Sequence, residues 1–214
     1  MDVVLTDTEV RVLGCLIEKE MATPDYYPLS LNALQNGCNQ TSNREPIVSY
    51  DEKQVSDALE GLKEKGLVLQ DNLGRVPKYS EVFLKTTNLV QREAAILCVL
   101  MLRGPQTSGE IRGRTERLHP FGSLEEVQKT LQTLEEWGYV ILLPRQPGRK
   151  ESRYAHLLSG PPEKKEEKAP NAETIPQSAP LESESVSKLQ EEVKLLRQEL
   201  AELKQAFLDF KGQF

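Results

Sequence analysis

One hydrophobic pattern occurs twice along this chain, beginning at residue 55 and again at residue 127. The copies read Val55-x3-Leu59-x2-Leu62-x3-Gly66-Leu67-Val68 and Val127-x3-Leu131-x2-Leu134-x3-Gly138-Tyr139-Val140. Apolar residues spaced three and four apart predict one face of a helix, and the glycine after them is typical of a helix C-cap. The residues that follow each glycine predict a β-strand. The chain therefore contains two related modules.

Each predicted strand is followed by a turn rich in glycine and basic residues, and then by a second strand with a tyrosine. The two segments are Gly74-Arg75-Val76-Pro77-Lys78-Tyr79 and Gly148-Arg149-Lys150-Glu151-Ser152-Arg153-Tyr154. Helix, strand, turn and strand form the closing half of a winged helix. Two such modules indicate a scaffold for nucleic-acid binding or for assembly, rather than an enzyme.

Reciprocal capping pairs predict where the helices begin. In such a pair a Ser, Thr, Asp or Asn side chain accepts from the third helical amide, and a Glu or Gln reaches back. The pairs are Thr6–Glu9, Asp51–Gln54, Asn88–Gln91, Thr107–Glu110 and Ser123–Glu126. Second helices are expected over 30–38 and 109–118. In the first helix we expect Val10, Leu13 and Ile17 to face the core. In the first helix of the second module we expect the same of Ala95, Val99 and Leu102.

The two modules are expected to differ in one segment. The predicted caps Thr6 and Asp51 lie 45 residues apart, whereas Asn88 and Ser123 lie 35 apart. The extra ten residues fall within 21–50, which includes the polar run Asn39-Gln40-Thr41-Ser42-Asn43-Arg44-Glu45-Pro46. Polar residues of this kind favour turns and side-chain-to-backbone hydrogen bonds. Two interpretations remain open: a well-bonded loop that closes an enlarged module, or a binding loop.

Two segments resemble a known family. Leu29-Ser30-Leu31-Asn32-Ala33-Leu34, followed by Cys38-Asn39-Gln40 and Arg44-Glu45-Pro46, is similar to a signature of the YceH-like family of uncharacterised bacterial proteins. Thr107-x2-Glu110-Ile111-Arg112-x-Arg114-x-Glu116-Arg117-Leu118 resembles its second hallmark. The resemblance covers about residues 4–158. It implies a tandem winged-helix fold and no established activity.

The last third of the chain follows different patterns. Residues 160–180 hold five prolines and a Glu-Lys-Lys-Glu-Glu-Lys block, a composition that predicts a disordered linker. Residues 181–214 then carry an apolar heptad typical of a parallel coiled coil, with Phe207, Phe210 and Phe214 at its end. The dimerisation residues are expected to be Val186, Leu189, Val193, Leu196, Leu200 and Leu203. The alternative is a lone helix that docks on the modules.

We therefore expect an α+β fold that is mostly α. Its parts are a winged-helix domain over 1–87, a second over 88–159, the linker over 160–180 and the coiled-coil helix over 181–214. No apolar run is long enough to span a bilayer, and no secretory pattern is seen, so we expect a soluble, cytoplasmic protein. The three cysteines have no metal-binding spacing, and Cys15 and Cys98 are predicted to be buried free thiols.

Catalytic motifs are missing from the sequence. The two histidines, His119 and His156, have no Cys, His or carboxylate at metal-ligand spacing. No phosphate-binding loop, dinucleotide fingerprint or nucleophile elbow is found. The sequence predicts no enzyme, no cofactor and no metal site.

Basic residues point instead to nucleic acid. The net charge is −6, but residues 88–162 carry 10 basic against 8 acidic side chains. Arginine forks suit phosphate, because they offer paired donors at fixed geometry. The expected phosphate-binding residues are Arg112, Arg114 and Arg117 on the second helix, Arg145, Arg149, Lys150 and Arg153 on the second wing, and Arg75 and Lys78 on the first. The alternative is a solvated basic hairpin, with the arginines of the second helix paired to Glu110 and Glu116.

Both third helices begin with acidic residues, Asp51 and Glu52 in one and Glu125 and Glu126 in the other. Carboxylates repel phosphates, so readout of a DNA groove by the third helix is disfavoured. The first hypothesis is a dimeric DNA-binding protein, a candidate regulator of transcription, that uses its wings and the arginine-bearing helix. The rival is a protein–protein scaffold that binds no nucleic acid.

Overall fold

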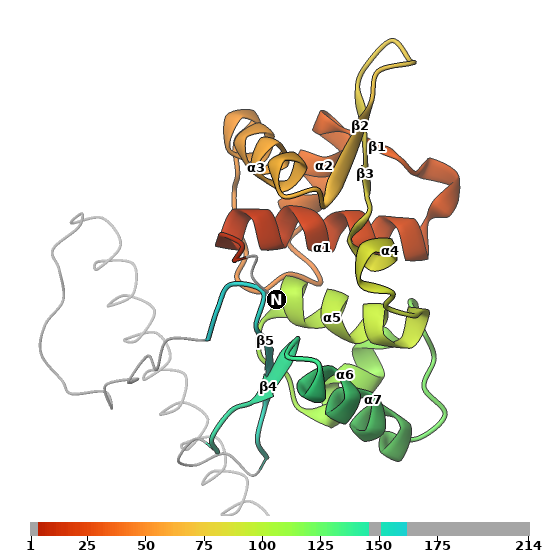
Figure 1. Ribbon diagram of the computed structural model, residues 1–214, viewed down its shortest axis with the longest axis vertical. Helices are drawn as coiled ribbons and strands as arrows, with labels where there is room; N and C mark the ends of the chain where they lie inside the picture. Colours follow the sequence, from red (N-terminus) through yellow and green to blue (C-terminus); the bar gives the residue numbers. More distant parts are fainter. Residues whose placement is uncertain (1–3, 146–150, 162–214) are drawn as a thin grey trace, which may run out of the picture. The chain divides into compact units, whose positions relative to one another are not determined.

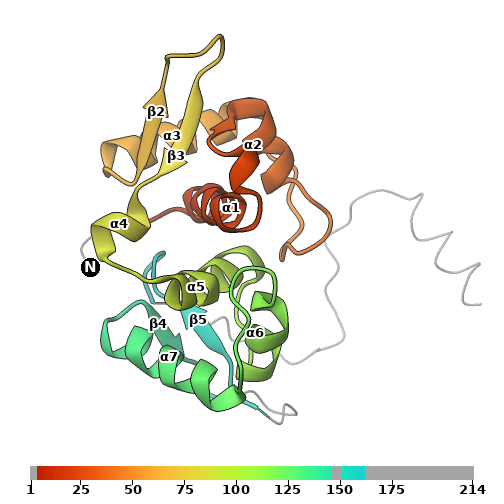
Figure 2. The same cartoon turned by 90° about the vertical axis from the view of Figure 1, so that its right-hand side faces the viewer.

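The fold is a mixed α+β arrangement of helices and small antiparallel sheets, shown in Figure 1 and Figure 2. The computed structural model describes residues 4–145 and 151–161. The predicted linker beyond residue 161, the coiled coil with its six dimerisation residues, and Arg149 and Lys150 lie outside the described residues. Both modules belong to one compact unit.

The first module contains three helices and a three-stranded sheet. Its helices are α1 (Asp7–Ala22), α2 (Leu31–Cys38) and α3 (Glu52–Glu64), with a short 3-10 helix η1 (Pro24–Tyr26) after α1. Its strands are β1 (Leu29–Ser30), β2 (Val68–Asp71) and β3 (Lys78–Glu81), in the order β1-β3-β2. A short helix that the sequence pattern did not predict, α4 (Phe83–Thr87), leads to the second module.

The second module repeats this order. Its helices are α5 (Gln91–Arg103), α6 (Ser108–Thr115) and α7 (Leu124–Glu136), and its hairpin is β4 (Val140–Leu142) with β5 (Tyr154–His156). Gly66 and Gly138 both have positive φ, at 68° and 75°, and so end α3 and α7 as the sequence predicts. Helix α6 is shorter than the predicted span 109–118.

The two hairpins share one register. Val68 pairs with Glu81 in the first, and Val140 pairs with His156 in the second. Tyr79 lies between Leu29 and Gln70, and Tyr154 lies between Gln106 and Leu142. Glu81 and His156 are therefore equivalent positions. In the second module an isolated bridge between Gln106 and Tyr154 takes the place of β1.

The predicted capping pairs form at Thr6, Asp51 and Thr107, where side chain and backbone bond in both directions. At Ser123 the hydroxyl accepts from Glu126 N, but the Glu126 carboxylate accepts from Gly122 N instead of reaching back to the cap. The cap predicted at Asn88 is wrong. Asn88 ends α4 with φ 55°, a left-handed conformation that asparagine tolerates.

Helix α5 begins two residues later, and its N-cap is Val90, whose N–H donates to the Glu93 carboxylate at 2.8 Å. The corresponding caps thus lie 33 residues apart in the second module, against 45 in the first. The first module is longer than its partner by 12 residues, two more than the sequence suggested. Helix α1 is three residues longer than α5, the connection that contains η1 adds four residues, and the loop after α2 adds five.

Helices α1 and α5 pack against each other and join the modules (Figure 2). Every residue from Glu9 to Ile17 and from Glu93 to Leu102 is buried, because each helix has a core on one side and its partner on the other. Gly14 permits this approach, since an added Cβ would lie 3.0 Å from Leu102 Cδ2. Leu102, expected in the core of its own module, therefore faces α1. Cys15, Cys38 and Cys98 are buried free thiols.

Candidate functional site

The loop between α2 and α3 is anchored by Arg44, one of the predicted family-motif residues. Its side chain is 0% exposed, and its Nη2 lies 2.6 Å from Glu18 Oε2 on α1. Its Nε donates to the Gly37 carbonyl at 3.1 Å, and its Nη2 lies 3.6 Å from Cys15 Sγ. A buried guanidinium bonded in this way fixes the loop to its own module. The interpretation as a well-bonded loop is thus supported for Arg44.

Other residues of the family motif also hold this loop in place. Asn39 exchanges two hydrogen bonds of 2.8 Å with the backbone of Tyr50, so it closes the loop at both ends. The Pro46 carbonyl accepts from Arg11 Nη2 at 2.7 Å. Glu45 N donates to the Leu102 carbonyl at 2.9 Å, a bond that reaches into the second module. The loop therefore also touches the neighbouring module.

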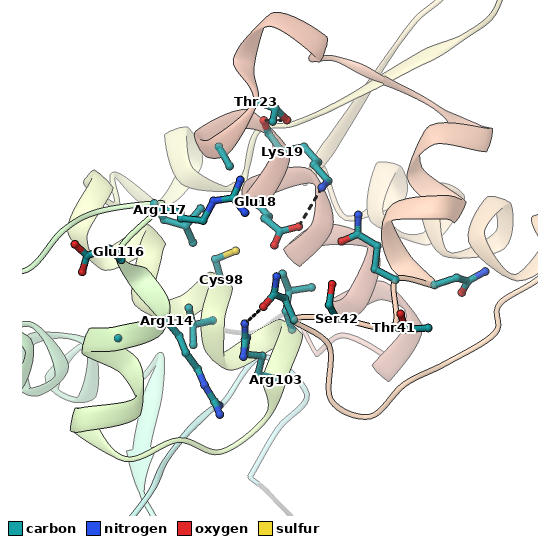
Figure 3. A pocket seen from close by; sticks show the side chains of 18 residues that line it. Glu18, Lys19, Thr23, Thr41, Ser42, Cys98, Arg103, Arg114, Glu116 and Arg117 are labelled. Atoms are coloured by element: carbon teal, nitrogen blue, oxygen red, sulfur yellow. Dashed lines mark hydrogen bonds and ion pairs between the residues drawn. The ribbon is translucent and has the colours of Figure 1, made fainter.

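A pocket of about 670 Å³ lies between the modules, and this loop forms one wall (Figure 3). Helix α1 contributes Glu18 and Lys19 to it, and α5 contributes Arg103. The loop supplies Asn39, Gln40, Thr41, Ser42 and Asn43, while α6 and the turn after it supply Gly113, Arg114, Glu116, Arg117 and Leu118. Both segments that resemble family signatures therefore meet at this pocket.

Four cationic side chains line this pocket, namely Lys19, Arg103, Arg114 and Arg117. In Figure 3 the guanidinium of Arg117 points toward Glu18 and Lys19, and Arg103 bonds the side chain of Asn43. Asn43 holds φ 62°, a left-handed conformation that is uncommon outside glycine. Burial, followed by the nearby charge of Arg114, lowers the pKa of Arg103.

On the second hairpin, one arginine that was expected to bind phosphate already forms an ion pair. Arg153 Nη1 lies 3.0 Å from Glu110 Oε2 and also donates to the Pro105 carbonyl at 2.8 Å. Burial alone would raise the pKa of Glu110, but the Thr107 N–H and Arg153 outweigh it and lower the pKa. Arg153 is thus bound within its module, through a pairing that neither interpretation of the sequence predicted. Arg145 is exposed.

The outer side of α6 is more open. Arg112 is exposed, and its Nη2 donates to the Gly122 carbonyl at 3.2 Å. Arg114 and Arg117 both line the pocket, whereas Arg112 does not. Glu116 turns away from the pocket in Figure 3. Among the described residues, Arg112, Arg114 and Arg117 form no ion pair.

The first hairpin projects well beyond its module (Figure 1). Arg75 and Lys78 are exposed on it, and neither forms an ion pair with a described residue. Leu73 at the tip is 96% exposed, and Val76 beside Arg75 is 54% exposed. In Figure 1 the first hairpin lies above α1, and β4 and β5 lie in the module below it.

The third helices present acidic faces to solvent. Asp51, Glu52, Glu125 and Glu126 are all exposed at the starts of α3 and α7. The exposed cations on these helices are Lys53 and Lys129, each beside several carboxylates. These helix starts therefore repel phosphate, as their sequences predict.

Two buried titratable groups lie at the equivalent hairpin positions. Burial and a hydrogen bond with the Glu20 carboxyl raise the pKa of Glu81 to about 7. Burial lowers the pKa of His156 to about 4. His156 Nδ1 has no hydrogen-bond partner among the described residues. No group of three or more His, Cys, Asp or Glu in that part of the chain could hold a metal ion.

Sequence reasoning missed Lys19 and Arg103. Each is a single basic residue in the last turn of a helix, where a cation is ordinary because it complements the helix dipole. Only the packing of α1 on α5 brings them to one pocket. None of the described helices has the length and apolar character needed to cross a bilayer.

Comparison with known proteins identifies the family. Residues 5–149 match the model for a protein of unknown function, DUF480. A UPF0502 protein of Solibacter usitatus is 51% identical over the whole length of both chains, and one of Pelobacter propionicus is 50% identical over the same extent. A Koribacter versatilis relative is 55% identical over 74% of this chain and 75% of its own. The chain therefore belongs to the DUF480, or UPF0502, family of bacterial proteins.

Proposed function

We propose that this protein is a tandem winged-helix protein that binds double-stranded DNA and is a candidate regulator of transcription. In each module three helices are followed by an antiparallel hairpin, the order of elements in a winged helix. The YceH-like resemblance of the two signature segments implies the same fold. The first hairpin and the outer side of α6 contact backbone phosphates in this proposal.

The observation that carries the proposal is that four of the predicted cationic side chains are exposed and lack an ion-pair partner among the described residues. Arg75, Lys78, Arg112 and Arg117 are exposed, and none forms an ion pair within the described residues. A guanidinium with open donors can bind phosphate without first breaking an internal pair. Arg153 is the exception, because Glu110 already neutralises it.

The proposed mode of binding differs from readout by the third helix. The acidic starts of α3 and α7 would repel a groove lined with phosphates. The exposed Leu73, flanked by Arg75, suits a hairpin that enters the minor groove, where apolar side chains are often inserted beside basic ones. Such binding favours shape and charge over base sequence.

Dimerisation through residues 181–214 is part of the proposal. The heptad of Val186, Leu189, Val193, Leu196, Leu200 and Leu203 supports a parallel pair of helices. Two linked copies would raise the effective concentration of each basic surface, which matters in a chain with net charge −6. Residues 160–180 would then act as the disordered linker that separates the modules from the coil.

Binding of the full chain to a mixed-sequence duplex, measured by fluorescence anisotropy at several salt concentrations, tests the proposal. We expect affinity to fall steeply with salt, because counterions are released from the duplex. The triple variant Arg75→Ala/Lys78→Ala/Arg112→Ala should weaken binding and flatten the salt dependence. The log–log slope should fall by about one unit for each phosphate that the variant no longer neutralises.

The control is Lys53→Ala/Lys129→Ala, which removes two exposed cations from the acidic helices α3 and α7, against three in the test variant. It should leave binding unchanged. Equal weakening in both variants would show a non-local effect of net charge and contradict the assigned surface. An absence of binding even at low salt would reject the DNA-binding function.

A protein–protein scaffold is the second candidate. It is favoured by the exposed apolar side chains of the first hairpin, Leu69, Leu73 and Val76, together with the exposed acidic helix faces. Apolar groups ringed by polar ones are typical of protein contacts. Two results together would support this candidate. The chain would bind no duplex at low salt, and its protein partners would no longer bind the Leu73→Ser variant.

A further inference from the structure

We infer that the pocket between the modules binds a small organic oxyanion, a molecule that carries a phosphate or carboxylate group. The pocket is lined by α1 and the loop after α2 from the first module, and by α5 and α6 from the second. A ligand held there would bridge the modules. This inference goes beyond DNA binding, and it does not depend on it.

The first argument is the charge of the lining. Lys19, Arg103, Arg114 and Arg117 are opposed by two carboxylates, Glu18 and Glu116. Glu18 lies 2.6 Å from the buried guanidinium of Arg44 and 3.6 Å from Lys19, so it offsets Lys19 only in part. Glu116 points away from the pocket in Figure 3. The cavity is therefore positively charged, and low-dielectric walls strengthen its attraction for an anion.

The second argument is an unused donor. Arg114 Nη1 is buried and has no hydrogen-bond partner in the part of the chain that the structure describes. A buried polar atom without a partner costs free energy and calls for an explanation. Arg103 lies close enough to Arg114 for their charges to repel, and this repulsion contributes to the lowered pKa of Arg103. The Arg114 side chain extends past Arg103 and away from Glu18 in Figure 3. An oxyanion bound at the Arg103 end of the pocket would satisfy this donor and relieve the repulsion.

The third argument is the chemistry of the remaining walls. Thr41 and Ser42 supply hydroxyl groups, and Gln40 supplies an amide, all suited to further ligand oxygens. Val99, Leu102 and Leu118 add apolar surface on the side of the second module. Polar groups at fixed positions beside apolar surface are typical of small-molecule sites, which commonly occupy about 300–1,000 Å³. The volume of about 670 Å³ fits a metabolite.

The pocket is separate from the proposed DNA surface. Arg75, Lys78 and Arg112 do not line it, whereas Arg103 and Arg114 do. Variants at the two sites therefore report on different events. Arg117 borders both surfaces and is left unchanged in each experiment.

The experiment measures thermal unfolding of the full chain with three probes: inorganic phosphate, ribose 5-phosphate and succinate. Potassium chloride keeps the ionic strength constant, so that general screening does not change. We expect at least one probe to raise Tm in a saturable way, by about 5 °C at concentrations far above its Kd. The double variant Arg103→Gln/Arg114→Gln should lose this rise.

The matched control is Lys53→Gln/Lys129→Gln, which removes the same charge outside the pocket and should keep the full rise. If the double variant unfolds, Arg114→Lys serves in its place. That variant keeps the charge but loses the planar fork, and it should raise the Kd of the probe at least about tenfold. A saturable rise that is equal in the pocket and control variants, or no saturable rise with any probe, would overturn the inference.

Discussion

The two hairpins bury different titratable side chains at the same register position, Glu81 opposite Val68 and His156 opposite Val140. Burial disfavours the charged form of both side chains. The direction of the pKa shift is nevertheless opposite, upward to about 7 for the acid and downward to about 4 for the base. The shared fold thus sets the burial, and the residue type sets how stability responds to pH.

The modules also differ in how they hold an arginine. Arg44 in the first module is 0% exposed and paired with Glu18, whereas Arg153 in the second is 23% exposed and paired with Glu110. A buried pair depends on both members, since removal of one leaves an uncompensated charge. A partly exposed pair depends less on its members, because water replaces the missing partner.

The largest expected effect breaks the buried pair. Arg44→Met should lower the free energy of unfolding by about 3–5 kcal/mol, because Glu18 keeps only the longer contact to Lys19 and the loop loses its anchor. Arg153→Met in the second module should cost about 1 kcal/mol or less. Urea unfolding of the full chain measures both.

Adding Glu18→Gln to Arg44→Met provides the control. It should recover part of the loss, since no unpaired carboxylate remains beside the vacated space. Equal losses for Arg44→Met and Arg153→Met would show that burial does not separate the two pairs.

A smaller effect concerns the pH dependence of the first hairpin. The native pKa of Glu81, about 7, lies above its ordinary value of 4.5, so the native state binds the proton more tightly. The resulting stabilisation is complete below pH 4.5 and is lost as the pH rises through 7. Unfolding between pH 5 and 8 should show a loss on the order of 1–3 kcal/mol that Glu81→Gln removes. An unchanged slope in that variant would assign the loss to another group.

The smallest effect belongs to the second hairpin and has the opposite sign. The native pKa of His156, about 4, lies below its ordinary value of 6.5, so the unfolded chain takes up the proton first. Stability is therefore full above pH 6.5 and falls as the pH drops toward 4. In a Glu81→Gln background, this loss should be about 1–2 kcal/mol and should vanish in His156→Gln. A loss that persists without the imidazole would contradict this assignment.

Much of the local structure could be predicted from the sequence. The caps at Thr6, Asp51 and Thr107 and the glycines that end α3 and α7 depend on residues within one turn of each other. Asn88 shows the limit of this reasoning. Asparagine suits a helix N-cap and a left-handed helix end equally well, and the unpredicted helix α4 decides between them.

The candidate site was predicted only in part. Arg114, Arg117, Asn39 and Gln40 were singled out from the sequence, but nothing in it placed them around one cavity. Lys19 and Arg103 carried no signal beyond an ordinary basic residue at a helix end. The pairing of Arg153 with Glu110 was not predicted, because the sequence suggested only arginines of the same helix as partners for Glu110.

The sequence by itself therefore determined the order of the elements, the duplication and most helix ends, since these follow from contacts between near neighbours in the chain. Tertiary structure alone decided which charges are neutralised, which residues are buried on two sides, and where a pocket forms. The neutralised charges depend on long-range contacts within each module. The burial on two sides and the pocket depend on the packing of α1 on α5, which joins residues more than 80 positions apart, such as Gly14 and Leu102. Helical periodicity marks a buried face, but it does not name the partner that buries it.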